Sequence, residues 1–427
     1  MEAAADAGGV LEVVVFPWLA FGHMLSFLEL SKRLAARGHA VTFVSTPRNL
    51  ARLPTVPPHL SPRLRFVPLP LPRVDGLPDG AESTADVPPE KIELVKKAMD
   101  GLAAPLAAFL ADAVAAGRRP DWIVHDFCHH WVPPIAGEHG VPCAAFMTVY
   151  AAFVVFLGPR WANVEHPRAA TEDFAVAPRW IPLRRGRARM FALLTDLFQQ
   201  PAIPAGILLP PVIADEDGDR PEILRWLDDQ PPKSVIYVAL GSEAPLTPGI
   251  LHELALAGVR FLWALRRPSG MFSAAIDAVT DDDLLPAGFE ERTRGRGLVR
   301  TGWVPQVVAL AHGATGAFLT HCGWGSTIES FASGHPLVML PFVLDQPLVA
   351  RAMAEKGVGV EVARDETDGS FDRDGVAAAV RRVMVDEEGK ALASNAMKLR
   401  EVLTDQGRQE TYIDDLVEHL RRYRGCC

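Results

Sequence analysis

The most constraining feature of the sequence is a segment in which an apolar strand runs through a glycine-containing turn directly into a helix. The strand is predicted over Gly316 to Thr320, the turn over His321 to Ser326 and the helix over Thr327 to Ala332. At such a junction the first N–H groups of the helix lack intrahelical partners, and the helix dipole adds partial positive charge. The sequence therefore predicts an α/β fold with an anion site, suited to a diphosphate, at the end of this strand.

Apolar runs typical of buried strands alternate with amphipathic runs along the rest of the chain, which indicates doubly wound parallel sheets. In the N-terminal half, strands are expected at Val10 to Phe16, Ala40 to Ser45, Leu64 to Leu69 and Trp122 to Val124, and helices at Met24 to Gly38 and Pro89 to Ala116. In the C-terminal half, strands are expected at Ser234 to Leu240, Arg260 to Leu265, Gly297 to Arg300, Ala317 to Thr320 and Leu337 to Leu340. With 427 residues, the chain is long enough for two domains that each bury a core.

The expected domain boundaries follow from a change of composition near the middle of the chain. Residues 204–222 are rich in proline and contain the acidic run Asp215 to Asp219, as is typical of a linker. We therefore expect an N-terminal domain over residues 1–203 and a second domain over residues 223–404. Residues 405–427 form a C-terminal segment in which Tyr412 to Tyr423 is predicted to be helical.

A histidine and an aspartate each follow a predicted strand in the N-terminal half. His23 lies between the strand Val10 to Phe16 and the helix Met24 to Gly38, and Asp126 comes just after the strand Trp122 to Val124. Open α/β sheets bind their ligands at the carboxyl edge, where both residues are expected. A carboxylate there could orient the imidazole and stabilise its protonated form, which would make His23 a general base.

Other interpretations of the histidines stay open. His23 alone could equally be a helix cap, and His125, His129 and His130 compete with it for the role of base. The last three also have a spacing that a metal site could use. Because no further cluster of ligands appears in the sequence, we expect no metal.

Composition and charge argue against several classes of function. The net charge of −9 and the pI of about 5.8 disfavour nucleic acid and anionic membrane as partners, because an acidic surface offers them nothing. Near the N-terminus, Glu2 and Asp6 stand where a signal peptide needs basic residues. The five cysteines are odd in number, which suits free thiols in a reducing compartment. We therefore expect a cytoplasmic globular protein.

Two segments bear on membrane attachment. Val141 to Leu157 carries no charge but falls short of the roughly 20 residues that a membrane span needs, and Pro142 favours a buried strand followed by a helix. The terminal Cys426 and Cys427 resemble a double-cysteine prenylation site, although a match of two residues is weak. We expect no stable membrane insertion.

The segment from Trp303 to Gln346 resembles the signature segment of the plant secondary-product UDP-glycosyltransferases. This resemblance implies an inverting enzyme of the GT-B fold, in which two Rossmann-like domains face a cleft and a C-terminal helix returns to the first domain. It implies a UDP-sugar donor, a small-molecule acceptor, no metal cofactor and a monomeric protein. A nicotinamide oxidoreductase is disfavoured, because no predicted strand is followed by GxGxxG and a downstream acidic residue.

The resemblance also assigns the nucleotide contacts. Trp303 would stack its ring on uracil, and Gln306 and Glu329 would bind the ribose hydroxyls. His321 and Ser326 would donate hydrogen bonds to the diphosphate. Singly, Trp303 could be a core aromatic and Glu329 a solvated helix residue. The complete set of expected donor contacts is Ser242, Trp303, Val304, Gln306, His321, Trp324, Gly325, Ser326, Glu329, Asp345 and Gln346.

The donor sugar is expected to meet a second group of these residues. By resemblance, Trp324, Asp345 and Gln346 would hold its hydroxyl groups, and Gln346 favours glucose. Asp345 and Gln346 could instead only cap the next helix. Ser242 belongs to a second candidate phosphate loop, Gly241 to Glu243. An ordinary turn after a strand would have much the same sequence.

Together these positions predict a single displacement with inversion. His23 would take the proton of an acceptor hydroxyl, whose oxygen attacks the anomeric carbon, while UDP leaves toward the turn at His321 to Ser326. The loop Val67 to Thr84 resembles the branch that adds a sugar to a flavonoid or terpenoid glycoside; as an alternative, it is only a polar surface loop. The predicted function is transfer of glucose or rhamnose from UDP to a hydroxyl of such a glycoside.

Departures from the family pattern motivate an alternative of another class. Gly325 stands where the family usually has Asn, which removes an amide that could reach the phosphates, and Ser26 replaces a usual proline. The chain is short between Tyr150 and Pro201, and the predicted helix near Ile250 to Leu256 runs almost directly into the next strand. The alternative is a catalytically degenerate relative that binds nucleotide without transfer.

Overall fold

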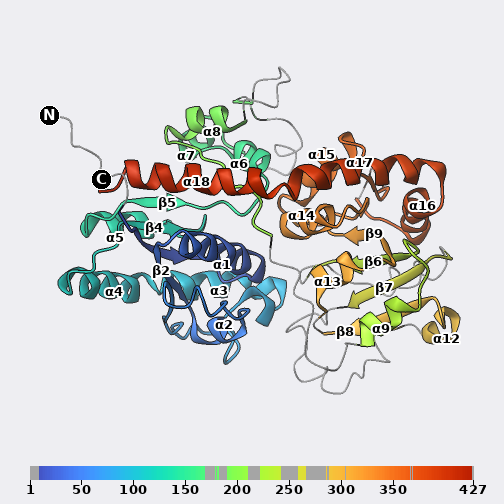
Figure 1. The fold of residues 1–427 in the computed structure, drawn as a ribbon, viewed down its shortest axis with the longest axis horizontal. Helices are drawn as coiled ribbons and strands as arrows, with labels where there is room; N and C mark the ends of the chain where they lie inside the picture. Colours follow the sequence, from blue (N-terminus) through green and yellow to red (C-terminus); the bar gives the residue numbers. More distant parts are fainter. Residues whose placement is uncertain are drawn as a thin grey trace.

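The computed structural model describes residues 9–168, 178, 180–181, 190–209, 222–241, 258–265, 285, 288–302, 304–365, 367 and 369–425. Within this part of the chain the strands form two separate sheets whose strand pairs are all parallel. Figure 1 shows the sheets in two lobes that lie side by side, each with helices packed around it. The expected doubly wound pattern is therefore confirmed.

The sheet of the first lobe has five strands in the order β3-β2-β1-β4-β5. They are β1 (Glu12–Phe16), β2 (Ala40–Ser45), β3 (Leu64–Pro68), β4 (Trp122–His125) and β5 (Cys143–Ala145). Successive side chains point to opposite faces, so that Val13 and Val15 join one hydrophobic core while Val14 and Phe16 join the other. The strand order reverses between β1 and β4, and sheets of this kind bind ligands at the carboxyl ends of such a pair.

Helices cover both faces of this sheet (Figure 1). They are α1 (Phe21–Ala36), α2 (Pro47–Arg52), α3 (Ile92–Asp100), α4 (Ala103–Ala115) and α5 (Val132–Glu138). The lobe also contains α6 (Ala151–Leu157), α7 (Arg160–Glu165) and α8 (Met190–Phe198), of which α6 and α8 pack together in a separate hydrophobic cluster. The prediction of one helix from Pro89 to Ala116 was wrong, because a turn at Gly101 separates α3 from α4. A Cβ at Gly101 would lie 2.5 Å from Cγ of Pro72, so the turn lets the proline-rich loop approach the backbone.

One stretch among the described residues, Ile92–Ala115, is long and apolar enough to cross a membrane by length and composition, which is weak evidence taken alone. Val95 of α3 and Leu106 of α4 are buried in the same core as Ile123 of β4. The pair therefore packs as core helices of the first lobe. The segment Val141 to Leu157 forms β5 followed by α6, so the expected order of strand and helix is confirmed, but β5 is partly exposed rather than buried.

The sheet of the second lobe has six strands in the order β11-β10-β9-β6-β7-β8. They are β6 (Val235–Ala239), β7 (Arg260–Leu265), β8 (Gly297–Thr301), β9 (Thr315–Thr320), β10 (Leu337–Met339) and β11 (Gly359–Glu361). Its helices are α9 (Glu222–Asp228), α12 (Phe289–Thr293), α13 (Gln306–Ala311), α14 (Trp324–Ala332), α15 (Gln346–Glu355), α16 (Arg373–Met384) and α17 (Glu387–Leu403). The strand order reverses between β6 and β9, so this lobe repeats the plan of the first.

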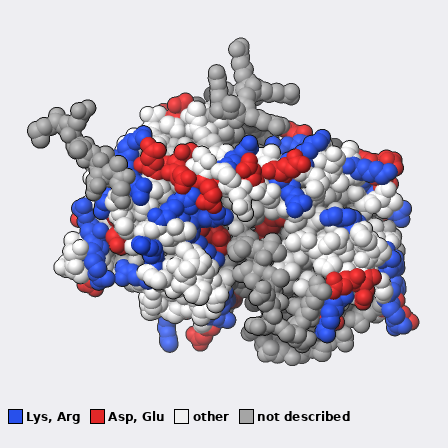
Figure 2. Space-filling model, viewed as in Figure 1, with Lys and Arg blue, Asp and Glu red and all other residues white. Residues whose placement is uncertain are grey.

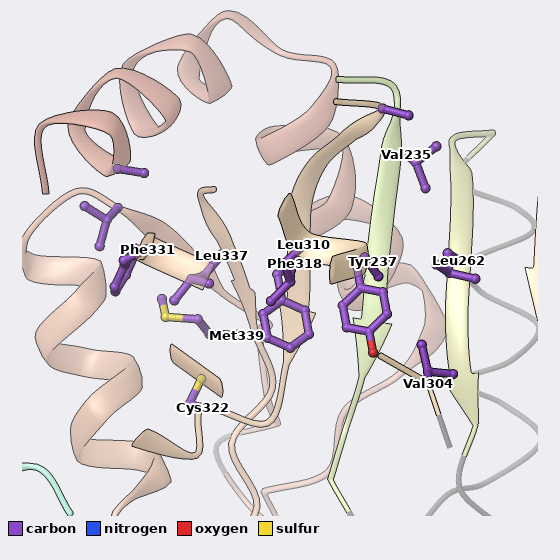
Figure 3. Close-up of a cluster of buried hydrophobic side chains, with 14 of the residues drawn as sticks. Val235, Tyr237, Leu262, Val304, Leu310, Phe318, Cys322, Phe331, Leu337 and Met339 are labelled. Atoms are coloured by element: carbon purple, nitrogen blue, oxygen red, sulfur yellow. The ribbon is translucent and has the colours of Figure 1, made fainter. Parts of the chain in front are cut away.

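One core of the second lobe packs close to the expected donor contacts. Figure 3 shows the rings of Tyr237 and Phe318 beside each other on the sheet, with Cys322 and Val304 at the margin of the same cluster. The two ring centroids are 5.2 Å apart. The strands that lead to the turn at Cys322 are therefore rigidly packed, as a precise binding site requires.

The last helix, α18 (Gln406–Arg422), leaves the second lobe and packs on the first (Figure 1). Ile413 and Val417 are buried in the same core as Val13 of β1. Arg37 of α1 donates to Asp414 of α18 at 2.7 Å, which adds an ionic contact at the rim of this core. The expected return of the C-terminal helix to the first lobe is confirmed.

Several expectations lie outside the described residues. They concern the acidic run Asp215 to Asp219, the helix near Ile250 to Leu256, Ser242, Trp303, Cys426 and Cys427.

Figure 2 shows basic and acidic side chains interspersed over the described part of the visible face, rather than gathered into one large field of either sign.

Candidate active site

The histidine and aspartate predicted in the first lobe are in direct contact. His23 lies in the first turn of α1, and Asp126 follows directly after β4. Nδ1 of His23 is 2.8 Å from Oδ2 of Asp126. The His23 side chain is 20% exposed and the Asp126 side chain is fully buried, so the imidazole alone reaches solvent. Because α1 begins at Phe21, His23 lies inside the helix rather than before it, which corrects the predicted boundary.

The surroundings of Asp126 keep its carboxylate ionised. Burial by itself raises the pKa of Asp126, but the hydrogen bond and charge of His23 and the N–H groups of Trp18 and Phe127 outweigh it and hold the pKa below its ordinary value. Those N–H groups donate to Oδ2 at 3.0 Å and to Oδ1 at 2.8 Å. An ionised Asp126 accepts the Nδ1 proton of His23, which leaves Nε2 able to accept a proton.

A threonine that the sequence did not single out also touches this pair. Oγ1 of Thr148 lies 2.8 Å from Nδ1 of His23. Thr148 follows β5, the strand beside β4, and therefore sits at the same carboxyl edge. The signal that could have found it is a hydroxyl residue just past the next strand in the sheet.

The glycine-containing turn of the second lobe lies at the carboxyl end of β9. Its helix, α14, begins at Trp324 rather than at Thr327, so the predicted start was three residues late. Gly325 made the first turn look like loop, since glycine is a poor helix former. Gly323 is the N-cap and no side chain caps the helix, which leaves its first N–H groups available for an anion. Cys322 adopts a left-handed φ of +67°, a conformation that functional turns often contain.

Two glycines make room for the imidazole of His321. A Cβ at Gly241 would lie 2.9 Å from Nε2 of His321, and a Cβ at Gly323 would lie 2.5 Å from the same atom. Gly241 also has φ +78°, which disfavours any other residue there. The loops after β6 and β9 therefore meet at His321, where the strand order of the sheet reverses.

The residues expected at the ribose form one hydrogen-bonded group. Nε2 of Gln306, at the start of α13, donates to Oε2 of Glu329 at 2.6 Å and lies 3.2 Å from Oγ of Ser326. Burial raises the pKa of Glu329, and the hydrogen bond from Gln306 opposes that change. Both helices begin on the carboxyl side of the sheet, where His321 lies, because α13 follows β8 and α14 follows β9.

Asp345 and Gln346 lie at the start of α15, after β10. Asp345 is the N-cap residue but its side chain makes no capping hydrogen bond, and its Oδ2 has no hydrogen-bond partner among the described residues. Oε1 of Gln346 accepts N–H groups of Phe342 at 2.8 Å and Val343 at 3.1 Å. Gln346 thus orders its own loop with its carbonyl oxygen, and a ligand would meet its amide nitrogen.

The two lobes contact each other at this place. The rings of Tyr150, from the first lobe, and Trp324, from the second, have centroids 5.0 Å apart. Burial raises the pKa of Asp345, against the opposing effects of its own N–H, the N–H of Tyr150 and the charge of His23. The contact between Tyr150 and Trp324 therefore brings the two halves of the expected site together.

Four expected donor contacts need separate comment. Ser242 and Trp303 lie outside the described residues. The Val304 side chain is buried in the core of the second lobe, so only its backbone could meet a nucleotide (Figure 3). At Gly325 an added Cβ would meet no atom within 4 Å, so the missing asparagine side chain has room there.

The other histidines of the His125 to His130 stretch were considered as possible metal ligands. Nδ1 of His125 donates to the backbone oxygen of Asp126 at 2.8 Å. In the portion of the chain that is described, no group of three or more His, Cys, Asp or Glu residues is arranged to hold a metal ion.

Comparison with known proteins identifies the family. Residues 235–422 match the family described as UDP-glucoronosyl and UDP-glucosyl transferase, and residues 10–151 match the family described as glycosyltransferase, N-terminal domain. Over 96% of its length the chain is 38% identical to UDP-glycosyltransferase 91C1 of Arabidopsis thaliana, covering 97% of that relative. The chain is a plant family 1 UDP-glycosyltransferase.

Further relatives and solved structures agree with this UDP-glycosyltransferase assignment. UDP-glycosyltransferase 91D1 of Stevia rebaudiana is 39% identical over 99% of the chain and 94% of the relative, and soyasaponin III rhamnosyltransferase of Glycine max is 37% identical over 97% and 96%. UGT89C1 of Arabidopsis thaliana, solved with UDP-L-rhamnose, has a TM-score of 0.76 at 26% identity over 97% of this chain and 100% of that one. The UDP-glucosyltransferase of Polygonum tinctorium has a TM-score of 0.75 at 25% identity, over 97% and 99%. The GT-B fold, a UDP-sugar donor and transfer to plant small molecules are thereby established.

The UDP-glycosyltransferase is also short for its family. Its alignment with the Arabidopsis relative extends over 465 positions, whereas the chain has 427 residues. The relative therefore carries positions that this chain lacks.

Proposed function

We propose that this UDP-glycosyltransferase transfers glucose or rhamnose, with inversion, from UDP to a hydroxyl of a small-molecule glycoside such as that of a flavonoid or terpenoid. His23 acts as the general base and Asp126 assists it. The observation that carries the proposal is the 2.8 Å contact between His23 and the fully buried Asp126, at the place where the two lobes meet.

The proposed step is a single displacement. The acceptor hydroxyl gives its proton to Nε2 of His23 and its oxygen forms a bond to the anomeric carbon, while the bond from that carbon to the UDP oxygen breaks. The electron pair leaves with UDP, whose added negative charge meets the N-terminus of α14 and His321. The imidazolium formed on His23 is stabilised by the Asp126 carboxylate, which remains ionised.

The donor is held, in this proposal, by the second lobe. Gln306 and Glu329 bind the ribose, His321 and Ser326 the diphosphate, and the pair Asp345 and Gln346 the sugar. Support comes from Asp345, whose Oδ2 lacks a partner among the described residues although the side chain is only 8% exposed. A buried carboxylate oxygen of this kind is completed by a ligand hydroxyl.

The donor sugar and acceptor are inferred from weaker support. The relative from Glycine max is named a rhamnosyltransferase, and a relative from Gardenia jasminoides, 31% identical, is named beta-D-glucosyl crocetin beta-1,6-glucosyltransferase. The second name describes a sugar added to a glucoside, as the loop Val67 to Thr84 led us to expect. We also infer a cytoplasmic location, because Cys128 and Cys322 are free thiols.

The test is UDP release by purified protein supplied separately with UDP-glucose and UDP-rhamnose, with and without a panel of flavonoid and terpenoid glycosides. Release that depends on an acceptor and is abolished in His23→Ala, with UDP binding retained, is the expected result. Full activity of His23→Ala would exclude His23 as the general base. Activity only toward aglycones would exclude a glycoside as the acceptor.

The shortened chain favours one second candidate, a degenerate relative that binds nucleotide without transfer. The same experiment separates the two. UDP binding measured by calorimetry, together with no release for any donor and acceptor pair, would establish the degenerate relative and refute the proposed transfer.

A further inference from the structure

Asp126 is held at every one of its polar atoms. Its two carboxylate oxygens accept hydrogen bonds from His23 and from two backbone N–H groups. Its backbone oxygen accepts from Nδ1 of His125 at 2.8 Å. Its backbone N–H donates to Nδ1 of His129 at 3.1 Å. The proposed mechanism uses neither of the two backbone contacts, and the one with His129 holds the N–H group of Asp126.

His129 lies in the interior beneath the candidate site and not on its surface. Its side chain is fully buried, and its ring stacks on Phe16 with centroids 4.7 Å apart and an interplanar angle of 14°. The edge of Trp131 closes a further side at 5.7 Å. Phe16 ends β1, whose following loop leads to His23, while His129 follows β4 and Asp126. The imidazole of His129 therefore contacts the ends of both strands, β1 and β4, that lead to His23 and Asp126.

The contact defines the protonation state of His129. A backbone N–H can only donate, so Nδ1 must be an unprotonated acceptor and Nε2 must carry the proton. Burial lowers the pKa of His129 to about 3, which agrees with a neutral ring. Within the described residues Nε2 has no hydrogen-bond partner. An unsatisfied buried donor is destabilising, a cost that leucine at the same position would not carry, so packing alone does not account for a histidine here.

We propose that His129 is a positioning residue for the transfer reaction, which holds the main chain of Asp126 so that its carboxylate meets Nδ1 of His23. This inference rests on the proposed roles of His23 and Asp126. Loss of the acceptor frees the Asp126 N–H, which is buried and must find another partner. Because the carboxylate moves with its main chain, the orientation of the His23 imidazole changes, and a small misplacement of catalytic groups can reduce turnover about 100-fold.

The experiment compares three substitutions at one position. His129→Asn keeps an acceptor, since Oδ1 of asparagine occupies the place of Nδ1. His129→Leu removes the acceptor and keeps apolar volume, and His129→Gln keeps polarity but shifts the acceptor by one bond. His130→Leu, at the exposed neighbouring histidine, is the matched control.

We expect kcat to fall about 10- to 100-fold in His129→Leu and His129→Gln, with KM for the UDP-sugar changed less than about twofold. His129→Asn should remain within about threefold of the parent kcat, as should His130→Leu. If His129→Leu does not fold, as judged by circular dichroism and melting temperature, the comparison of Gln with Asn decides. Equal kcat in the Asn and Gln variants, or a parent-like kcat in a folded Leu variant, would overturn the proposal.

His23→Ala and Asp126→Asn are measured in parallel to separate this inference from the proposed function. If both lose turnover while every His129 variant keeps it, only the positioning role fails. If His23→Ala keeps turnover, the proposed base fails and the positioning role fails with it.

Discussion

Each lobe places a histidine at the carboxyl end of one of the two strands between which its strand order reverses, and the two histidines have different surroundings. His23 lies after β1 and touches a buried carboxylate and the hydroxyl of Thr148. His321 lies after β9, where the backbones of Gly241 and Gly323 approach its ring and leave no space for a side chain. An acidic partner suits a histidine that gains and loses a proton. Glycine backbone close to the ring, beside a helix N-terminus, suits a histidine that binds an anion. The same side chain can therefore have different chemical roles according to its neighbours.

The largest effect is expected from substituting either His23 or its acidic partner Asp126. His23→Ala and Asp126→Asn should lower kcat by about 10²- to 10⁴-fold, the usual contribution of a general base, with UDP affinity unchanged. Single-turnover transfer and calorimetric UDP binding measure the two quantities. His59→Ala, at an exposed histidine of the same lobe, is the control. A loss of UDP affinity that parallels the loss of kcat would show that the two histidines do not divide their roles as stated.

The two lobes should share a common sensitivity to acid, because each contains a buried neutral histidine. Burial is the main cause that lowers the pKa of His129 in the first lobe to about 3 and of His335 in the second to about 4. Above pH 6.5 both residues are neutral in the folded and unfolded chain, so neither affects stability. As the pH falls from about 6.5 toward 4, the unfolded chain binds protons that the folded chain excludes, and stability falls by up to about 1.4 kcal/mol per pH unit for each histidine.

Urea unfolding at a series of pH values across this window measures the slope. His129→Asn and His335→Asn should each reduce it by about one proton, in the lobe where the substitution lies. Slopes that are the same in the parent and in both variants would show that these histidines are not the source of the acid sensitivity.

An alanine at Gly241 should harm the second histidine site. The change adds a Cβ 2.9 Å from Nε2 of His321 and forces a non-glycine residue into φ +78°. We expect a loss of about 1–2 kcal/mol from the backbone alone and a raised KM for the donor from displacement of His321. Gly117→Ala, with φ +69° and no atom within 4 Å of the added Cβ, reports the backbone cost by itself. If the two variants have equal KM, contact with His321 does not matter for donor binding.

The smallest effect is expected at Gly325. Gly325→Asn restores an amide near the first turn of α14, where an added Cβ has open space, and should lower KM for the UDP-sugar by about threefold, or less than 1 kcal/mol. Gly325→Ala adds the Cβ without the amide and should change KM less. An unchanged or raised KM in the asparagine variant contradicts a role for the amide at the phosphates.

Local patterns in the sequence predicted the strands better than the helix starts. β2 and β7 have the predicted bounds, since both are apolar runs that the sheet buries on its two faces. α1 and α14 begin three residues earlier than predicted, because glycine in each first turn resembles loop and neither N-cap side chain marks the boundary. The pairing of His23 with Asp126 was predictable from strand ends alone. Thr148 was missed, because recognising it requires the further inference that β5 lies next to β4, which is a feature of the sheet and not of any local motif.

The return of α18 to the first lobe determines when the first lobe can complete its folding during synthesis. Leu11 and Leu420 belong to one core, and Nε1 of Trp122 donates to the backbone oxygen of Leu420 at 2.8 Å. Domains made first usually fold first as the chain emerges from the ribosome. Here the lobe that carries His23 is translated first but lacks part of its core until residue 420 has emerged. A ribosome-bound chain would thus expose this apolar face throughout translation of the second lobe, and chaperones that bind nascent chains have a defined surface to protect.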